Sequence, residues 1–528
     1  MHDMENRIII KANTEDPTQK MQDVLANLSP DVETIIEFEK GTYYFRRKGS
    51  AQHRIFASSA PSGVNHVIFP ILNQKNLTID GNGSDFVFCD RVQPFLVCNS
   101  ENITFRNFQT DFSFLRYAYG TIKEIGAEGF SIEIDRSKFD YVVSDGNLTF
   151  VCGEDRLSTK TRKISMKRLY PEKSRVYFLY ASDTQAKINK AAPSVFVHIA
   201  EKDGSVFFRY EKETTHVDFS VGDRICLSYD NDREAQTFFL DNSRNILVQN
   251  VCIHRGGGMG FVADVCEDIT LDRFKIQLKE GRAEYYTTTA DGIFLTNCSG
   301  NFTLKNSLIR DTYDDAINIH GFYLAVSQVL SENEAELVHL HPAHEGVMLC
   351  KSGDTLRVSQ PTDFMDIGEI GIIEVCYDED RKKIRIKHNG AVTLAPGMLL
   401  ENAKRMPRVL IESNEFINCP HIRLSSGNML IRNNTFCLND CDLYIWDLVH
   451  FWAESGATEQ VQIIGNRFGN KSRSNIAIGS DRPSSSNRQH QSVIIQNNVF
   501  SFERERALSI RSVEKLKERD NIFGDEKE

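Results

Sequence analysis

Apolar and polar residues alternate in short runs that recur along the chain, and many of these runs carry an Asn at one or both ends. Examples are Asn76-Leu-Thr-Ile, Asn245-Ile-Leu-Val-Gln-Asn-Val, Met429-Leu-Ile-Arg-Asn-Asn-Thr-Phe and Val461-Gln-Ile-Ile-Gly-Asn-Arg-Phe. Such alternation is the signal of a strand. The Asn suits a bend, because its side chain bonds nearby backbone and tolerates left-handed geometry. We therefore expect an all-β fold, a right-handed parallel β-helix in which stacked Asn residues form ladders.

The repeat stops twice, and each gap has antiparallel strands joined by charged turns, such as Val221-Gly-Asp-Arg-Ile and Gly353-Asp-Thr-Leu. We interpret the gaps as two inserted β-barrel-like subdomains. Near the N-terminus, Met21, Val24 and Leu25 have helical spacing, so a short helix should cover the open end of the solenoid. The expected divisions are the N-terminal cap and first coil (1–50), β-helix (51–114), first insertion (115–235), β-helix with an acidic repeat (236–322), second insertion (323–404), and C-terminal coils and tail (405–528).

The acidic repeat places three aspartates in one frame. Asp291 precedes one alternating apolar run, and the pair Asp314-Asp315 precedes the next. Overlaying the runs puts Asp291 on Asp315 with a period of 24 residues, about one coil of a parallel β-solenoid. Neighbouring strands lie roughly 4.8 Å apart, so the three carboxyl groups should crowd one patch. Crowding of this kind is unfavourable, and proteins usually keep it for acid–base chemistry or for binding a cation.

The composition of the chain limits the kinds of partner and site that we expect. The 528 residues carry a net charge of −11, which argues against nucleic acid, and no run approaches the length of a membrane span. The 12 cysteines include no CxxC pair, so we expect buried free thiols and no zinc site. Met1-His-Asp-Met-Glu-Asn-Arg does not have the form of a signal peptide. A secreted or periplasmic location is expected with its signal not visible here, a cytoplasmic one stays open, and so does the oligomeric state, a homo-oligomer included.

Two carboxyl groups acting on one glycosidic bond are the minimum for inverting hydrolysis. One is protonated and assists the leaving oxygen, while the other is ionised and activates water, at a separation of about 6.5–9.5 Å. A third carboxylate helps, because mutual repulsion raises one pKa and keeps an acid protonated near neutrality.

The segments Ala290-Asp-Gly and Asp314-Asp-Ala-Ile-Asn-Ile-His-Gly resemble the aspartate motifs of polygalacturonase-type β-helix glycosidases. The chain is more closely similar to the exo-acting α-1,3-galactosidases of glycoside hydrolase family 110. Val251-Cys-Ile-His-Arg-Gly-Gly-Gly-Met-Gly, Thr288-Thr-Ala-Asp-Gly and Trp452-Ala-Glu-Ser-Gly support the narrower match. The resemblance implies an inverting exo-glycosidase acting on terminal α-1,3-linked galactose. The sequence has no Cys/His cluster, and carboxyl groups used as acid and base need no cation, so we expect no cofactor and no metal.

The resemblance also implies roles. Asp314 would be the general acid, and Asp291 with Asp315 would activate the water. Asn318 and His320 alternate with buried isoleucines, so they should face the cleft and bind sugar hydroxyls. The further substrate-binding candidates are His254, Arg255, Arg282, Trp452 and Glu454.

The chain departs from the polygalacturonases at the residues that would meet a uronate carboxylate. It has no Gly-His-Gly, and its only Arg-Ile-Lys, at Arg385, falls within the second insertion. A neutral galactose is therefore the expected substrate, and the choice between branched blood-group B-type and linear ends stays open.

Two other classes of function are also compatible with the sequence. A calcium-dependent polysaccharide lyase would also cluster acids on a β-helix, and its activity would be lost to a chelator. A non-catalytic carbohydrate-binding β-helix would bind without turnover.

Overall fold

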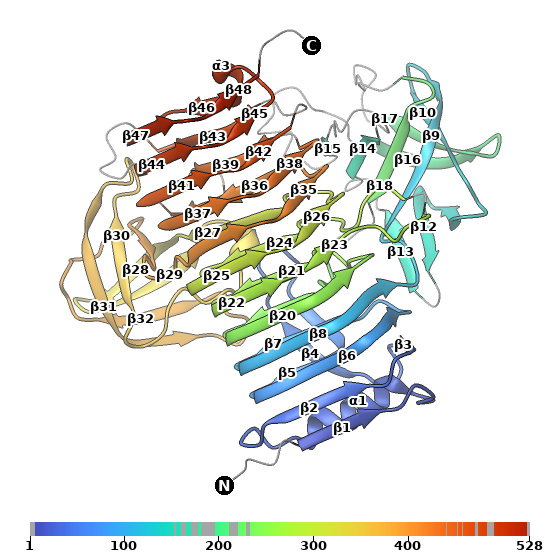
Figure 1. Cartoon of the computed structure of the whole chain (residues 1–528), viewed down its shortest axis with the longest axis horizontal. Coiled ribbons are helices and arrows are strands. Elements are labelled where there is room, and N and C mark those ends of the chain that lie inside the picture. The colour runs from blue at the N-terminus through green and yellow to red at the C-terminus, as the bar shows by residue number, and fades with distance from the viewer. Residues whose placement is uncertain are drawn as a thin grey trace.

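The computed structural model describes residues 6–152, 155–159, 165–169, 178–180, 196–210, 220–228, 233–282, 284–439, 441–450, 452–456, 458–469, 474–482 and 490–524. Its centre is a stack of coils formed by two large sheets of predominantly parallel strands (Figure 1). The predicted all-β parallel β-helix with inserted β-rich subdomains is confirmed. Within the described residues, no helix is long and apolar enough to cross a membrane.

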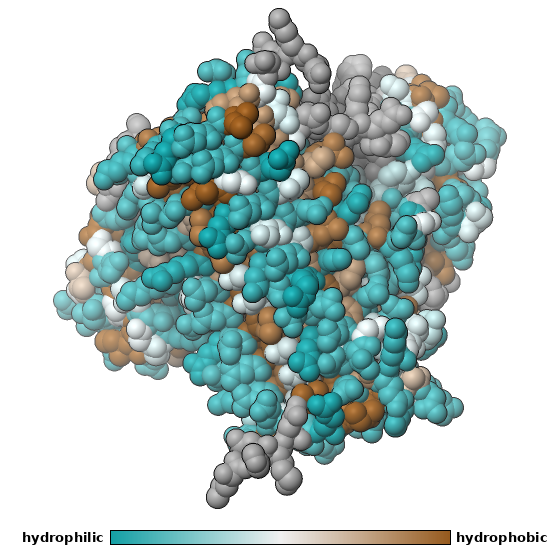
Figure 2. All heavy atoms as spheres, viewed as in Figure 1, coloured by the Kyte–Doolittle hydropathy of each residue, from teal (hydrophilic) through white to brown (hydrophobic). Residues whose placement is uncertain are grey.

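The larger sheet has 20 strands among the described residues. Its middle coils are β20 (Arg244–Ile253), β22 (Glu267–Asp272), β25 (Ser299–Lys305), β34 (Arg408–Glu412), β37 (Asn428–Arg432) and β41 (Gln460–Ile464). Its outer face carries mostly hydrophilic residues (Figure 2). Its inward side chains, such as Leu271, Leu304 and Ile411, are fully buried. This alternation of inward apolar and outward polar residues is what the sequence pattern predicts for the coils.

The second sheet carries the site. Its strands are β4 (Ala51–Ile55), β5 (Gly63–Leu72), β7 (Gln93–Cys98), β19 (Phe238–Asp241), β21 (Phe261–Asp264), β24 (Ile293–Thr296), β27 (Ile317–Phe322), β36 (His421–Leu424), β39 (Cys441–Asp447), β40 (Glu454–Ser455), β43 (Ser474–Ser480) and β46 (Leu508–Ile510). We call this second sheet the site sheet.

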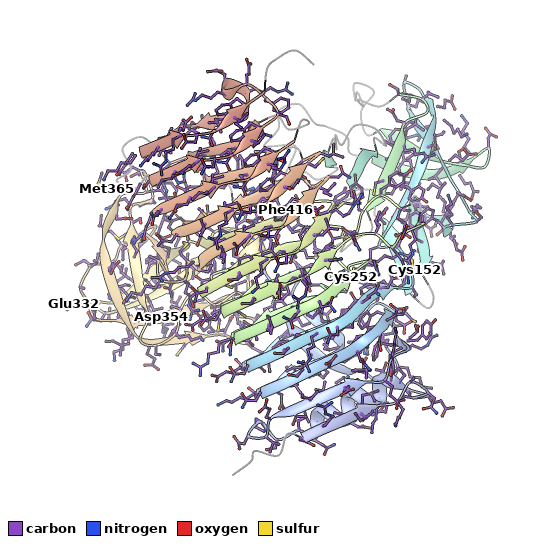
Figure 3. All side chains as sticks on the ribbon, in the orientation of Figure 1. Cys152, Cys252, Glu332, Asp354, Met365 and Phe416 are labelled. Carbon is purple, nitrogen blue, oxygen red and sulfur yellow. The ribbon has the colours of Figure 1, made fainter. Side chains whose placement is uncertain are left out.

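Identical side chains stack between coils. Phe416, labelled in Figure 3, starts a column in which Phe436, Phe468 and Phe500 follow with ring centroids 5.3, 4.8 and 4.8 Å apart. A buried ladder of amides runs beside it, with Asn414 Nδ2 donating to Asn434 Oδ1 at 3.0 Å and the same bond repeated on later coils. The Asn ladders expected from the repeat are therefore present, and they satisfy buried polar groups at the bends.

The N-terminal end is covered by helix α1 (Pro17–Ala26), which begins at the cap residue Asp16. Met21 and Leu25 pack into the main core, and Gln22 Nε2 donates to two carbonyl oxygens of β5 at 2.9 Å. The predicted capping helix is therefore present, and it shields the first coil from water.

The two gaps in the repeat are antiparallel. The first contains the three-stranded sheet of β11 (Asp140–Ser144), β12 (Asn147–Cys152) and β13 (Asp155–Thr159), together with a seven-stranded sheet. The strands of that seven-stranded sheet are β9 (Tyr117–Ile125), β10 (Gly129–Ile134), β14 (Ser165–Leu169), β15 (Phe178–Tyr180), β16 (Phe196–Lys202), β17 (Ser205–Tyr210) and β18 (Arg224–Ser228).

The second gap is a closed barrel of β28 (Leu324–Ser331), β29 (Glu334–His339), β30 (Thr355–Ser359), β31 (Asp366–Tyr377), β32 (Ile384–His388) and β33 (Leu399–Glu401). The barrel stands beside the coils, and its residues Glu332 and Met365 are labelled in Figure 3. Arg385 lies on β32 and pairs with Glu336 at 3.3 Å, so the Arg-Ile-Lys segment is part of the barrel wall.

Candidate active site

The three aspartates meet on neighbouring coils of the site sheet. Ile293 of β24 pairs with Ile317 of β27, which places Asp291 beside Asp315 just before the two strands. The Gly292 N–H donates to the Asp315 carbonyl oxygen at 2.8 Å. A Cβ on Gly292 would lie 2.8 Å from the carbonyl oxygen of the next coil, so the Asp-Gly sequence is required for close packing. The predicted 24-residue register is confirmed.

The carboxyl groups form one cluster. One oxygen from each of Asp291, Asp314 and Asp315 lies within 4.8 Å of the others. The Asp291 and Asp315 side chains are each 3% exposed, whereas that of Asp314 is 25% exposed. Asp314 is therefore the member of the cluster that a substrate can reach most easily.

Two arginines flank the cluster. Arg233 Nη2 lies 2.8 Å from Asp314 Oδ2, and its Nη1 lies 3.5 Å from Asp291 Oδ2. On the other side, Arg423 Nε lies 3.5 Å from Asp315 Oδ2. These guanidinium groups offset part of the repulsion among the acids. The same three oxygens could also hold a cation, because hard cations take carboxylate ligands.

Burial is the largest influence on the pKa values of Asp291 and Asp315. It raises the pKa of Asp291 well above its usual value, and the neighbouring Asp314 raises it further. Burial also raises the pKa of Asp315, to about 7, although Arg423 opposes this. The cluster therefore retains a proton near neutral pH. Perturbed carboxyl groups in a partly open site are typical of acid–base chemistry.

Gly257 and Gly258 leave room for the backbone at Arg233 to pack close to the coil. Gly258 N–H donates to the Glu234 carbonyl oxygen at 2.7 Å, and a Cβ on either Gly257 or Gly258 would overlap the backbone of residues 233–235. Ser59 fixes the other side of the arginine, accepting a hydrogen bond from Arg233 Nη1 at 2.6 Å. The Gly-Gly-Gly segment thus lets residues near the end of the first insertion approach the aspartates.

Asn318 and His320 extend the polar surface along β27, where both are buried. His320 Nε2 lies 3.6 Å from Glu454 Oε1, and Arg423 Nη1 lies 4.0 Å from the same oxygen. Glu454 reaches this position because β40 pairs antiparallel with the end of β27. The structure therefore brings Asn318, His320 and Glu454 onto the same face as the aspartates.

Trp452 lies on the barrel side of this surface. His341 packs against it with ring centroids 4.8 Å apart, and His344 Nε2 lies 2.9 Å from the Trp452 carbonyl oxygen. His344 also contacts the His320 ring at 5.4 Å. Burial lowers the pKa of His344 well below its usual value, so it is neutral near pH 7. Residues of the second insertion thus connect Trp452 to the polar surface.

The other three binding candidates contact different residues. His254 Nε2 lies 2.5 Å from Gln109 Oε1, and Arg282 pairs with Asp111. Arg255 pairs with Glu284, and both arginines line a separate pocket of about 380 Å³ between the coils and the first insertion. Cys152, labelled in Figure 3, also lines that pocket. In the described residues none of these three makes a hydrogen bond or ion pair with the aspartate cluster, and their participation in sugar binding remains a prediction.

Sequence reasoning missed Arg233, Arg423 and Ser59. Arg423 had a detectable signal: His421-Ile-Arg-Leu alternates like Ile317-Asn-Ile-His, and β36 pairs with β27 so that Arg423 lies beside Asn318. Arg233 and Ser59 had none, because both come from loops that reach the cluster only through long-range packing.

The chain is similar in sequence to curated α-1,3-galactosidases. No family model matches the chain. An α-1,3-galactosidase A of Shewanella woodyi is 25% identical over 507 residues, covering 94% of this chain and 81% of the relative. An α-1,3-galactosidase B of Phocaeicola vulgatus is 25% identical over 563 residues, covering 99% and 89%. An α-1,3-galactosidase A of Bacteroides thetaiotaomicron is 24% identical, covering 90% and 83%.

Among solved structures, the catalytic domain of a GH87 α-1,3-glucanase aligns with 9% identity and a TM-score of 0.36, covering 99% of this chain and 70% of its own. A surface adhesin of Streptococcus pneumoniae aligns with a TM-score of 0.34 and 9% identity, covering 97% and 89%. Neither likeness is close enough to bear on function.

Proposed function

From this relationship to the α-1,3-galactosidases of glycoside hydrolase family 110, we propose that the chain is an exo-glycosidase that removes terminal α-1,3-linked galactose with inversion. The observation that carries the proposal is the cluster of Asp291, Asp314 and Asp315 on adjacent coils, within 4.8 Å and flanked by two arginines. The relatives that cover most of the chain bear the name of this activity.

Asp314 acts as the general acid in this proposal. It is the most exposed carboxyl group of the three, so it can reach the glycosidic oxygen. Its proton passes to that oxygen as the bond to C1 breaks, and the aglycone leaves as an alcohol. The repulsive, buried cluster retains a proton near neutrality, and the close spacing of the three groups allows that proton to be supplied through Asp314.

Asp291 and Asp315 act together on the water. Burial raises the pKa of Asp315 to about 7, which matches a base that works near neutral pH. As the water attacks C1, its proton passes to this pair. The new bond forms on the face opposite the departing oxygen, so β-galactose is released first.

The carboxyl spacing favours a second candidate mechanism. The nearest oxygens lie within 4.8 Å, below the roughly 6.5–9.5 Å usual between the carboxyl groups of inverting enzymes. A separation of about 5–5.5 Å is instead typical of retaining enzymes, in which one carboxylate attacks C1 itself. A retaining reaction would release α-galactose first, so the product anomer separates the two mechanisms.

The galactose is held by the polar surface next to the cluster. Asn318, His320 and Glu454 can exchange hydrogen bonds with its hydroxyl groups. Trp452 supplies an aromatic face beside His341, suited to the apolar face of a sugar ring. A carbohydrate outside the cell is the natural source of such ends, so we place the enzyme in a secreted or periplasmic compartment.

The test is a panel of oligosaccharides that differ in the terminal linkage. Galactose should be released from α-1,3-galactobiose, while α-1,4- and β-linked isomers should be cleaved far more slowly. Linear and branched blood-group B-type substrates are compared in the same assay. Release of an unsaturated sugar would favour the lyase, and binding without release would favour the non-catalytic β-helix.

A further inference from the structure

A column of outward side chains crosses the site sheet at right angles to its strands. Phe294 of β24 pairs with Asn318 of β27, Asn318 with Arg423 of β36, and Arg423 with Tyr444 of β39. Adjacent strands are roughly 4.8 Å apart, so Tyr444 lies roughly 10 Å from Asn318 along this column. The aspartate cluster stands next to the middle of the column, where Arg423 contacts Asp315.

The column is closed on its N-terminal side. Phe294 is 4% exposed and packs in an apolar cluster with Met259 and Val262, which are fully buried. Ile55 of the β4 hairpin covers the same cluster. Met259 occupies the position of Asp291 on the preceding coil, because β21 and β24 pair in register. A sugar chain cannot extend past the terminal galactose in this direction.

The C-terminal end of the column, on β39, carries two aromatic side chains. Tyr444 is half-buried, and its ring stacks on Trp446 with centroids 5.3 Å apart at 9°. The Arg511 guanidinium lies over the Trp446 ring, 4.3 Å from its centroid. A Cβ on Gly479 would lie 2.6 Å from the indole, so the glycine makes room for it. The tyrosine is therefore held on a rigid, packed base.

The Tyr444 ring also contacts β36, the neighbouring strand toward Asn318. His421 lies against its ring at 5.6 Å, and the Arg423 guanidinium lies 5.7 Å from the ring centroid. Within the part of the chain that the structure describes, the Tyr444 hydroxyl makes no hydrogen bond and is not sealed from solvent. A polar hydroxyl on an aromatic ring is suited to a sugar, which has apolar C–H faces and polar edges.

We propose that Tyr444 forms a wall of the aglycone subsite, which takes the neutral hexose to which the terminal galactose is linked. This inference rests on the function proposed above and gives the substrate a direction across the sheet. Galactose lies over Asn318 and the aspartates, and the next sugar lies over Arg423 toward Tyr444. The apolar closure at Phe294 makes the enzyme exo-acting, and Tyr444 contributes to the choice of aglycone.

The experiment compares two substrates that share the galactose and differ in the leaving group. α-1,3-Galactobiose occupies the aglycone subsite, whereas α-galactosyl fluoride leaves it empty. Tyr444→Ala should lower kcat/KM for the disaccharide about 10–100-fold, as removal of a buried aromatic contact does at interfaces. Hydrolysis of the fluoride should stay within about threefold of the wild type, because the galactose contacts are unchanged.

Tyr444→Phe is the second variant, since it keeps the ring that packs on Trp446. Losing one hydrogen bond should lower kcat/KM for the disaccharide about threefold to tenfold, with the fluoride unaffected. The matched control is Tyr44→Ala, which removes a tyrosine that is 55% exposed on the N-terminal coil. It should leave both substrates unchanged.

An equal loss on both substrates, or unchanged disaccharide hydrolysis in Tyr444→Ala, would overturn the subsite. Failure of the wild type to hydrolyse either substrate would instead overturn the proposed function, and the subsite with it. The two failures are therefore distinguishable in a single set of assays.

Discussion

The Arg233 guanidinium contacts the Asp314 carboxyl group at the mouth of the acidic cluster, with Nη2 2.8 Å from Oδ2. The same guanidinium reaches Asp291 at 3.5 Å and Ser59 at 2.6 Å. One cation from the first insertion thus contacts both a partly exposed and a buried carboxyl group. Its position makes it the residue that sets the charge of the cluster from the solvent side.

Arg233→Met should lower kcat/KM about 10–100-fold, because the cluster loses a cation that offsets its repulsion. Losing this cation raises the carboxyl pKa values, so the acidic limb of the pH–rate profile should move to higher pH. Arg7→Met, which removes a half-exposed arginine paired with Glu37 on the first coil, is the control. An unshifted acidic limb would show that Arg233 does not act on the catalytic carboxyl groups.

Asp314→Asn should reduce hydrolysis of α-1,3-galactobiose about 10²–10⁴-fold, because the leaving oxygen no longer receives a proton. Fluoride needs no proton to leave, so α-galactosyl fluoride should restore much of the rate. Asp291→Asn and Asp315→Asn should not be rescued in this way, since they impair activation of water. Equal rescue of all three variants would contradict the assigned roles, and rescue of Asp291→Asn alone would move the acid to Asp291.

Asp264 gives the fold a pH dependence. It accepts hydrogen bonds from Ser58 N at 2.8 Å and Ser58 Oγ at 2.5 Å, and burial raises its pKa to about 7. In an unfolded chain the value is about 3.9. A raised folded pKa contributes stability that is complete below about pH 4 and is lost as pH rises through about 7.

Asp264→Asn cannot ionise, so the fall in Tm between pH 5 and pH 8 should be smaller in this variant than in the wild type. Thermal unfolding at both pH values measures it, with Asp31→Asn, an exposed carboxylate, as the control. A fall in Tm as steep as in the wild type would show that Asp264 is not the titrating group.

Activity should survive dialysis against EDTA. The three carboxylates could hold a cation, yet Arg233 and Arg423 already place positive charge on both sides of them. Acid–base hydrolysis needs no further cation. Activity that is lost to EDTA and restored by calcium alone would support the lyase instead.

The coils and the aspartate register could be predicted from sequence because both depend on local repetition. Each coil repeats the same alternation, so Ile293 and Ile317 align without knowledge of the rest of the chain. Asn318 and His320 follow from the same alternation, since each comes directly after a buried isoleucine of β27, Ile317 or Ile319.

The residues of the site that could not be predicted from sequence lie in the turns and loops between strands. His254 and Arg255 lie at the start of the turn that follows β20, whereas Asp291 stands immediately before β24 and Asp315 immediately before β27. Position within the turn therefore separates residues that the sequence motif groups together. Arg233 approaches only because Gly257 and Gly258 carry no side chain, a contact between segments that no periodic pattern encodes.

The stereochemistry of the first product distinguishes inverting from retaining hydrolysis directly. Wild-type enzyme is mixed with α-1,3-galactobiose, and the anomeric proton signals are followed by NMR from the first seconds, before mutarotation. Inversion requires that β-galactose appears first and that α-galactose grows in only as mutarotation proceeds. Appearance of α-galactose first would contradict inversion and assign the closely spaced aspartates to a retaining mechanism.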